Sequence, residues 1–132
     1  MAAIALNHYN LRGDRATLDR LKDFYLTYVG LEVGPRPLNS FGYWLYAGGR
    51  DVLHLSEPRP GESRQTEMKT GFDHVAFTCT DLPAMLAKLK QDGIAYRHAV
   101  VEAKAGFATQ QQVFFCDPEG NGIELNFVDA AV

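Results

Sequence analysis

One pattern in the chain occurs twice: residues 44–55 read WLYAGGRDVLHL, and residues 114–125 read FFCDPEGNGIEL. The two stretches align without a gap, and each consists of an apolar segment, a glycine-containing turn and a second apolar segment, which is typical of a β-hairpin. Further toward the N-terminus, residues 6–8 (Leu-Asn-His) resemble residues 72–74 (Phe-Asp-His). Two patterns that recur in the same order along the chain indicate an internal duplication.

Each copy also contains a helix after its first histidine. Residues 17–29 and residues 83–91 carry apolar side chains at helical spacing, and each segment ends at a glycine, Gly30 or Gly93. Three strands are expected after each helix, at 31–36, 41–47 and 51–57 in the first copy and at 94–103, 110–116 and 121–128 in the second. Each copy is therefore predicted to be a β-α-β-β-β module. The fold class is α+β, with two tandem modules whose curved, mostly antiparallel sheets surround a metal or ligand cavity.

The two modules are joined by a segment rich in polar and turn-forming residues. Residues 58–71 read PRPGESRQTEMKTG and show no apolar periodicity, so they are interpreted as a linker. A chain of 132 residues has the size of one compact unit. We therefore expect residues 1–132 to form a single domain, with module one at about 3–57 and module two at about 72–128.

Four polar residues occupy two equivalent positions of the repeat. His8 aligns with His74, and His54 aligns with Glu124. If the modules are related by a pseudo-two-fold axis, inward-pointing side chains at these positions converge on it. Imidazole nitrogens and a carboxylate suit Zn, Ni, Fe(II), Mn or Co, and these donors do not select among the ions. A structural histidine and a solvated glutamate are the common alternatives for single residues, but the shared register favours a metal site.

Composition excludes several classes of partner. Hydrophobic residues make up 46% and charged residues 22% of the chain, and the net charge is -3 without a basic cluster, so we expect no binding to nucleic acid or to an acidic membrane. No apolar run has the length of a membrane helix, and no signal peptide is evident, so a cytoplasmic protein is expected. Cys79 and Cys116 are expected to be buried, reduced thiols. The partner is expected to be a small molecule.

The sequence resembles the vicinal oxygen chelate superfamily, which includes glyoxalase I, extradiol dioxygenases and metal-free bleomycin-resistance proteins. The resemblance rests on the two modules, on DHVAF at 73–77 and on DPEGNGIEL at 117–125, and it covers nearly the whole chain. It implies that His8, His74 and Glu124 bind a divalent metal ion. His54 stands where glyoxalase I usually has a second glutamate, so this chain departs from that enzyme.

The resemblance implies three alternative functions. The first is a metal-dependent lyase or isomerase, in which Glu124 transfers a proton next to a carbonyl of a substrate with vicinal oxygens. The second is an extradiol Fe(II) dioxygenase that uses His8, His74 and Glu124 as a two-His-one-carboxylate set. The third is a non-catalytic drug-binding resistance protein. The sequence does not choose between the two enzymes, and the retained polar positions argue against the third.

Further residues are candidates for contact with the substrate. Arg12 matches a glyoxalase I arginine that contacts the glutathione carboxylate, but the residues after His54 do not continue the glutathione pattern. The candidates for substrate binding are Arg12, Trp44, Tyr46, His98 and Phe107. Loops 36–43 and 97–109 are expected to wall the cavity, where Arg36, Arg97, His98 and Lys104 favour an anionic ligand. A homodimer is implied by the resemblance, with metal sites inside one chain or shared between two.

Overall fold

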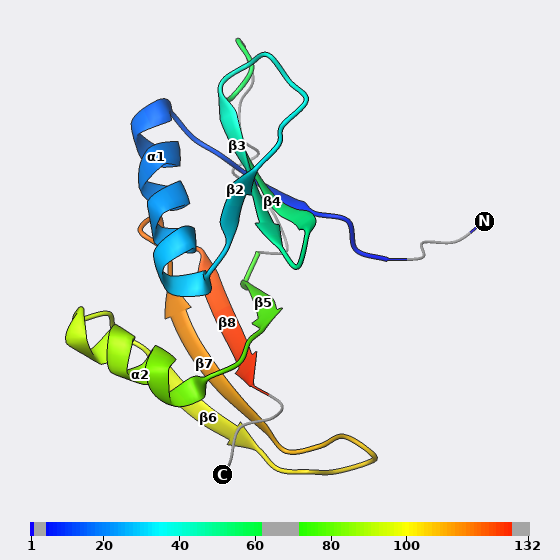
Figure 1. Cartoon of the computed structure of the whole chain (residues 1–132), viewed down its shortest axis with the longest axis vertical. Coiled ribbons are helices and arrows are strands. Elements are labelled where there is room, and N and C mark those ends of the chain that lie inside the picture. The colour runs from blue at the N-terminus through cyan, green and yellow to red at the C-terminus, as the bar shows by residue number, and fades with distance from the viewer. Residues whose placement is uncertain (2–4, 62–71, 128–132) are drawn as a thin grey trace. The chain divides into compact units, whose positions relative to one another are not determined.

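The computed structural model describes residues 1, 5–61 and 72–127 (Figure 1). The chain divides into two compact units, Met1–Lys69 and Thr70–Val132. Unit 1 contains β1 (Tyr9–Arg12), α1 (Arg15–Phe24), the π-helical segment η1 (Tyr25–Val29), β2 (Glu32–Gly34), β3 (Gly42–Ala47) and β4 (Arg50–Ser56). Unit 2 contains β5 (His74–Thr78), α2 (Leu82–Gln91), β6 (Arg97–Val101), β7 (Gln110–Cys116) and β8 (Gly122–Phe127). The predicted α+β class with two β-α-β-β-β modules is confirmed. That the two units form one domain stays a prediction.

Each unit is built on one four-stranded mixed sheet. The strand orders are β1-β4-β3-β2 and β5-β8-β7-β6, and in each sheet the first pair is parallel and the other two pairs are antiparallel. In sheet 1 Asn10 pairs with His54, and in sheet 2 Ala76 pairs with Glu124. Asn10 and Ala76 each lie two residues after the first histidine of their module. The two sheets therefore place His54 and Glu124 at equivalent positions, although β3–β4 shifts its register between Leu45 and Tyr46 and β7–β8 does not.

The two helices begin slightly earlier than predicted because an aspartate caps each one. The Asp14 side chain accepts a hydrogen bond from the Thr17 backbone N–H at 2.8 Å, so α1 begins at Arg15 rather than at Thr17. Asp81 caps α2 in the same way through Ala84. The predicted helix 17–29 is α-helical only to Phe24 and continues as η1, which ends at the left-handed Gly30.

The outer strands are shorter than predicted. Strand β2 covers 32–34 instead of 31–36, because Pro35 and Pro37 cannot donate ladder hydrogen bonds. Strand β6 covers 97–101 instead of 94–103. Residues 3–4, 62–71 and 128 of the predicted modules and linker lie outside the described residues.

Each unit has its own apolar core between its helix and one face of its sheet. In unit 1 the core residues are Leu18, Leu21, Tyr25, Leu31, Leu45, Leu53 and Leu55; in unit 2 they are Leu82, Leu89, Val113, Phe115, Ile123, Leu125 and Phe127. Because side chains alternate along a strand, His54 lies on the face opposite Leu53 and Leu55, and Glu124 lies opposite Ile123 and Leu125. The predicted ligand positions therefore lie on the helix-free faces of the two sheets.

The cysteine prediction is only partly right. Cys79 is half-buried, but Cys116, at the end of β7, is exposed, so the expectation that both thiols are buried is wrong for Cys116. The Cys116 side chain points to the helix-free face of sheet 2, opposite the buried Phe115. Among the described residues, no helix has both the length and the apolar character that a membrane crossing requires.

Candidate functional site

His54 lies at the centre of an aromatic stack on the helix-free face of sheet 1. Its ring is nearly parallel to that of His8, with ring centroids 3.7 Å apart, and to that of Trp44, at 4.1 Å. Its Nε2 donates to the Asp51 carboxylate at 2.7 Å, and only 9% of the residue is exposed. This hydrogen bond lowers the pKa of the Asp51 carboxyl from its ordinary value. The lone pair of the neutral His54 ring is then left on Nδ1.

The stack limits how His8 and His54 can act together. The lone pair of an imidazole nitrogen lies in the plane of its ring, and the two ring planes differ by only 17°. Lone pairs in two near-parallel planes do not converge on one ion at the roughly 2.0 Å that a metal–nitrogen bond requires. In this arrangement the two histidines contact each other without forming a shared ligand pair. That His54 is a metal ligand stays a prediction.

In unit 2, His74 and Glu124 form a pair that is suited to hold a metal ion. The His74 Nδ1 lies 2.7 Å from the Asp73 carboxylate, which accepts but cannot donate, so Nδ1 carries the proton. The remaining Nε2 lies 3.5 Å from Oε1 of Glu124, and Glu124 is only 8% exposed. A nitrogen lone pair and a carboxylate oxygen thus face each other, with Glu124 buried and the His74 side chain 39% exposed.

This separation fits two ligands of one divalent ion. Bonds of roughly 2.0–2.2 Å from each atom to an ion span the 3.5 Å between His74 and Glu124. A carboxylate on the second ring nitrogen is the usual partner of a metal-binding histidine, because it fixes the tautomer and raises the basicity of the ligand. Within the described parts of the chain, no group of three or more His, Cys, Asp or Glu side chains is placed to hold an ion. A third ligand would therefore have to join this pair.

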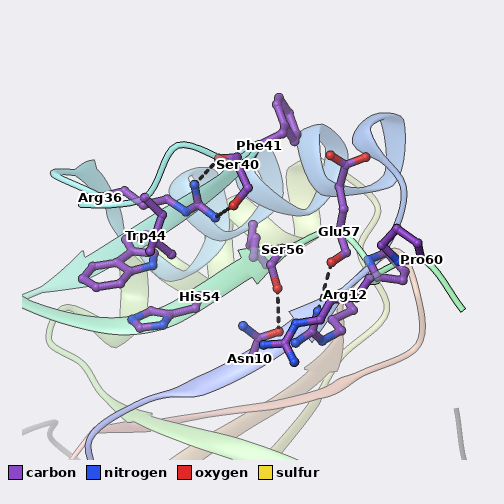
Figure 2. Close-up of a pocket in the computed structure, with 14 residues that line it drawn as sticks. Asn10, Arg12, Arg36, Ser40, Phe41, Trp44, His54, Ser56, Glu57 and Pro60 are labelled. Carbon is purple, nitrogen blue, oxygen red and sulfur yellow. Dashed lines mark hydrogen bonds between the residues drawn. The ribbon is translucent and has the colours of Figure 1, made fainter. Parts of the chain in front are cut away.

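Two of the predicted substrate-binding residues line one cavity of unit 1. Arg12 and Trp44 border a space of about 480 Å³ together with His54 (Figure 2). Arg12 projects from β1 and donates to the backbone oxygen of Glu57 at 3.0 Å. The cavity lies on the helix-free face of sheet 1, because Arg12, Trp44 and His54 all point to that side.

The other three candidates lie elsewhere. Tyr46 covers Gly34 and donates its hydroxyl to the Pro35 oxygen at 2.6 Å, outside the cavity of Arg12 and Trp44. His98 lies in strand β6 rather than in a loop, with Nε2 2.7 Å from the buried amide oxygen of Gln111. Phe107 is 70% exposed in a turn that is closed by a bridge to Lys104. Their contact with a substrate stays a prediction.

Two aspartates that orient His54 and His74 were not predicted from the sequence. Asp73 immediately precedes His74, and Asp51 lies three residues before His54. Both aspartates could have been predicted, because a carboxylate close in sequence to a histidine ligand commonly hydrogen-bonds its second ring nitrogen. Arg97 was predicted to favour an anionic ligand from loop 97–109, but it lies in strand β6. Its guanidinium is 4.2 Å from the centre of the Phe114 ring, and that ring also contacts His74.

Comparisons with known proteins agree with this architecture. The family model of the Glyoxalase/Bleomycin resistance protein/Dioxygenase superfamily matches residues 5–125. The chain is 32% identical over 124 residues to the protein named Glyoxylase I 4 of Arabidopsis thaliana, which covers 92% of this chain and 69% of that protein. It is 31% identical over 113 residues to Catechol-2,3-dioxygenase of Bacillus subtilis (strain 168), covering 83% of this chain but only 37% of that enzyme.

A solved structure shows the same fold. A protein from the mobile metagenome of V. Pseudocholerae aligns with a TM-score of 0.72 at 20% identity, covering 98% of both chains. The chain therefore belongs to the Glyoxalase/Bleomycin resistance protein/Dioxygenase superfamily. The superfamily contains both glyoxalases and dioxygenases, so membership sets the class of protein and leaves the reaction to be argued from the site.

Proposed function

We propose that this chain is a metal-dependent enzyme of the lyase or isomerase type that acts on a small substrate with vicinal oxygens. The observation that carries the proposal is the pair formed by His74 and Glu124. Its nitrogen and oxygen lie 3.5 Å apart, and Asp73 holds the histidine in the tautomer that a metal ligand needs.

His74 and Glu124 would hold the ion together with His8. The Nδ1 of His8 lies 2.7 Å from the amide oxygen of Asn7, which leaves Nε2 of the neutral ring available as a donor to a metal. His54 would serve the ligand cavity instead, because its ring already stacks on Trp44. When bound, a divalent ion supplies Lewis-acid polarisation of the substrate oxygens.

Glu124 would move the proton. Its carboxylate is buried and faces the candidate metal position beside His74, where it could take a proton from a carbon next to the carbonyl of a bound substrate. Glu124 would accept the proton from that carbon and return it to the neighbouring one, so that the substrate is isomerised without net oxidation. The relative named Glyoxylase I 4 supports this choice, because the match covers 69% of its length, against 37% for the dioxygenase.

Metal content tests the site directly. We expect the purified protein to retain about one divalent ion per site after dialysis, and we expect His74→Ala to lose it, because one of few ligands is removed. His98→Ala is the matched control, since its ring contacts Gln111 and not Glu124. Equal metal content in all three proteins, measured by plasma mass spectrometry, would exclude this ligand pair. Absence of metal in the wild-type protein would favour the non-catalytic binding function.

Turnover tests the role of Glu124. A methylglyoxal–thiol adduct is supplied to the Ni- or Zn-loaded protein, and its loss is followed by absorbance. We expect Glu124→Gln to lower kcat by at least about a hundredfold, as is common when a general base is removed. The glutamine side chain keeps an oxygen that can bind the metal. The metal content of the same sample is measured, so that a loss of turnover is distinguished from a loss of metal. Unchanged turnover in a metal-loaded variant would contradict the assignment.

A second candidate function is favoured by one observation. The stacking and hydrogen bonding of His54 leave His8, His74 and Glu124, which is a two-His-one-carboxylate set of the kind that non-haem Fe(II) oxygenases use. Oxygen uptake with catechols by the Fe(II)-loaded protein would establish this alternative, and it would exclude the proton-transfer assignment.

A further inference from the structure

The cavity of unit 1 is lined by more positive than negative side chains. Arg12, Arg36 and Arg59 are among its lining residues, and Glu57 is the one acid among them. Its apolar wall is formed by Leu38, Phe41 and Trp44. A cavity that combines guanidinium groups with aromatic surface suits a small anionic ligand that has an apolar body.

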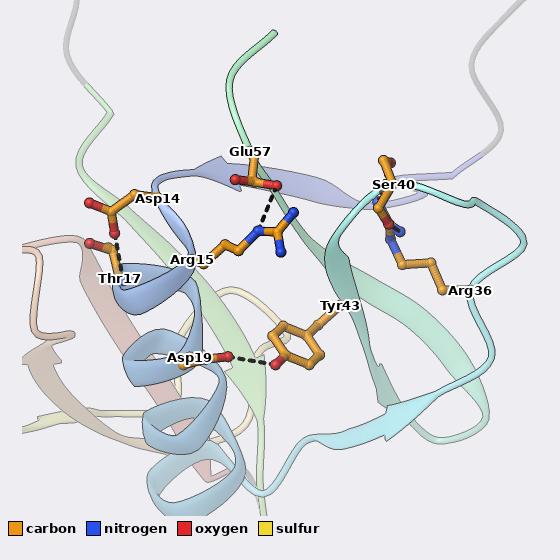
Figure 3. Close-up of polar contacts among 8 residues, drawn as sticks. All are labelled: Asp14, Arg15, Thr17, Asp19, Arg36, Ser40, Tyr43 and Glu57. Atoms are coloured by element: carbon orange, nitrogen blue, oxygen red, sulfur yellow. Dashed lines mark hydrogen bonds and ion pairs between the residues drawn. The ribbon is translucent and has the colours of Figure 1, made fainter.

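The Glu57 carboxylate is directed away from the arginines of the cavity. It accepts from Nε of Arg15 at 3.2 Å, on the side of helix α1 (Figure 3), while its backbone oxygen accepts from Arg12. Arg15 in turn lies 4.6 Å from the centre of the Phe41 ring. The single acid of the cavity is thus paired with an arginine that does not line it.

Arg36 is held in place by neutral groups. Its Nη1 donates to the Ser40 backbone oxygen and its Nη2 donates to the Ser40 hydroxyl at 3.2 Å (Figure 2). The guanidinium packs directly on the backbone of Gly42, where an added Cβ would come within 2.7 Å of Nη2. Loop 35–41 therefore folds around its own arginine and fixes the orientation of the group before any ligand arrives.

The charge of Arg36 has no carboxylate partner within the described residues. Its side chain is half-buried, and Nε is fully buried without a hydrogen-bond acceptor. A partly desolvated cation with an unpaired donor is costly unless an anion compensates it. A fixed guanidinium that lacks a carboxylate partner and has an unpaired N–H donor is suited to bind an oxyanion, because carboxylates and phosphates accept several N–H donors at once.

We propose that Arg36 is the specificity-determining residue of this cavity and that it binds a carboxylate or phosphate oxyanion of the substrate. The substrate is then an anion whose apolar body lies against Phe41 and Trp44. This inference rests on the proposed function only in taking the cavity as the substrate site, and it does not require a bound metal.

Trp44 provides the readout, because it is the single tryptophan of the chain and it lines the cavity. Metal-stripped protein is titrated with benzoate, phenyl phosphate and the neutral control benzamide, and the change in tryptophan fluorescence gives each Kd. We expect one of the two anions to bind at least about tenfold more tightly than benzamide, which corresponds to one charge-assisted contact. The tighter of the two anions identifies the oxyanion class.

Three variants assign the effect to Arg36. Arg36→Gln is expected to weaken anion binding about tenfold and to leave benzamide unchanged, and Arg36→Lys is expected to retain part of the preference because it keeps the charge. Arg50→Gln is the control, since Arg50 is exposed on β4 and does not line the cavity. Circular dichroism verifies that each variant is folded.

The proposal is overturned if neither anion binds more tightly than benzamide, or if Arg36→Gln weakens the anions and benzamide equally. Failure of the metal-content test leaves these titrations unaffected, because they are done without metal. An anion preference without metal binding would therefore reject the proposed enzyme function and retain the role of Arg36.

Discussion

At the scale of single residues, the carboxylates beside His54 and His74 decide which ring nitrogen of each of these two histidines is free. Asp73 fixes His74 so that Nε2 faces Glu124, whereas Asp51 fixes His54 within a stack. The repeat makes His54 and Glu124 equivalent in sequence, yet their surroundings differ. Equivalent positions in a duplicated fold can therefore have different contacts, with stacked rings around His54 in unit 1 and a histidine facing Glu124 in unit 2.

Substitution of Asp73 and of Asp51 is expected to have different effects on metal binding. We expect Asp73→Ala to weaken metal binding about 10- to 100-fold, because the second partner of a histidine ligand orients the ring and raises its basicity. Asp51→Ala is expected to leave metal affinity unchanged, since it releases a ring that already stacks on Trp44. Competition with a chelator of known affinity measures both. Equal weakening by the two variants would place His54 among the ligands.

The two thiols are expected to react at different rates. Burial raises the pKa of the Cys79 thiol, so less of the reactive thiolate is present at neutral pH, whereas Cys116 is exposed. Because the folded state favours the protonated Cys79, its contribution to stability is complete at neutral pH and is lost as the pH rises through the raised pKa. Iodoacetamide should label Cys116 faster than Cys79. Mass spectrometry should show that the two labelling rates become more similar at high pH. In Cys116→Ser, rapid labelling of Cys79 would contradict this account.

At the scale of secondary-structure elements, local chemistry explains what the sequence predicted and what it did not. The hairpin β7–β8 could be predicted closely, because a turn rich in Asp, Pro and Gly separates two apolar runs. The start of α1 was placed two residues late, because apolar spacing begins at Leu18 while the cap is the polar Asp14. The stack of Trp44 on His54 could not be predicted, since it depends on rotamers across neighbouring strands.

The N-terminus of α2 depends on an aspartate in an unusual conformation. Asp81 has φ 65° and accepts from the Ala84 backbone N–H at 3.2 Å. We expect Asp81→Ala to lower the free energy of unfolding by about 1 kcal/mol or more, because alanine loses the cap and tolerates positive φ poorly. Asp81→Asn should be nearly neutral, since asparagine keeps both properties. Urea unfolding measures the difference, and equal stability of the two variants would show that the cap is unimportant.

At the scale of the whole molecule, the duplication predicted both modules and the equivalent positions of His54 and Glu124 in their sheets. It could not predict whether the two compact units contribute to one site, because the proposed ligands are divided between them. His8 and His54 belong to unit 1, and His74 and Glu124 belong to unit 2. A three-ligand site of His8, His74 and Glu124 therefore needs one unit of each kind, either from one chain or from two.

We propose that the protein is a homodimer in which each site combines unit 1 of one chain with unit 2 of the other. In that case His8→Ala and His74→Ala proteins, each unable to hold metal, regain binding when mixed, because a heterodimer contains one site with both histidines intact and one with neither. Random exchange makes half of the dimers heterodimers, so about a quarter of all sites should bind metal. Sedimentation establishes the dimer, and metal content after exchange establishes the sharing. A dimer that regains no metal after verified subunit exchange would mean that all ligands of a site come from the same chain.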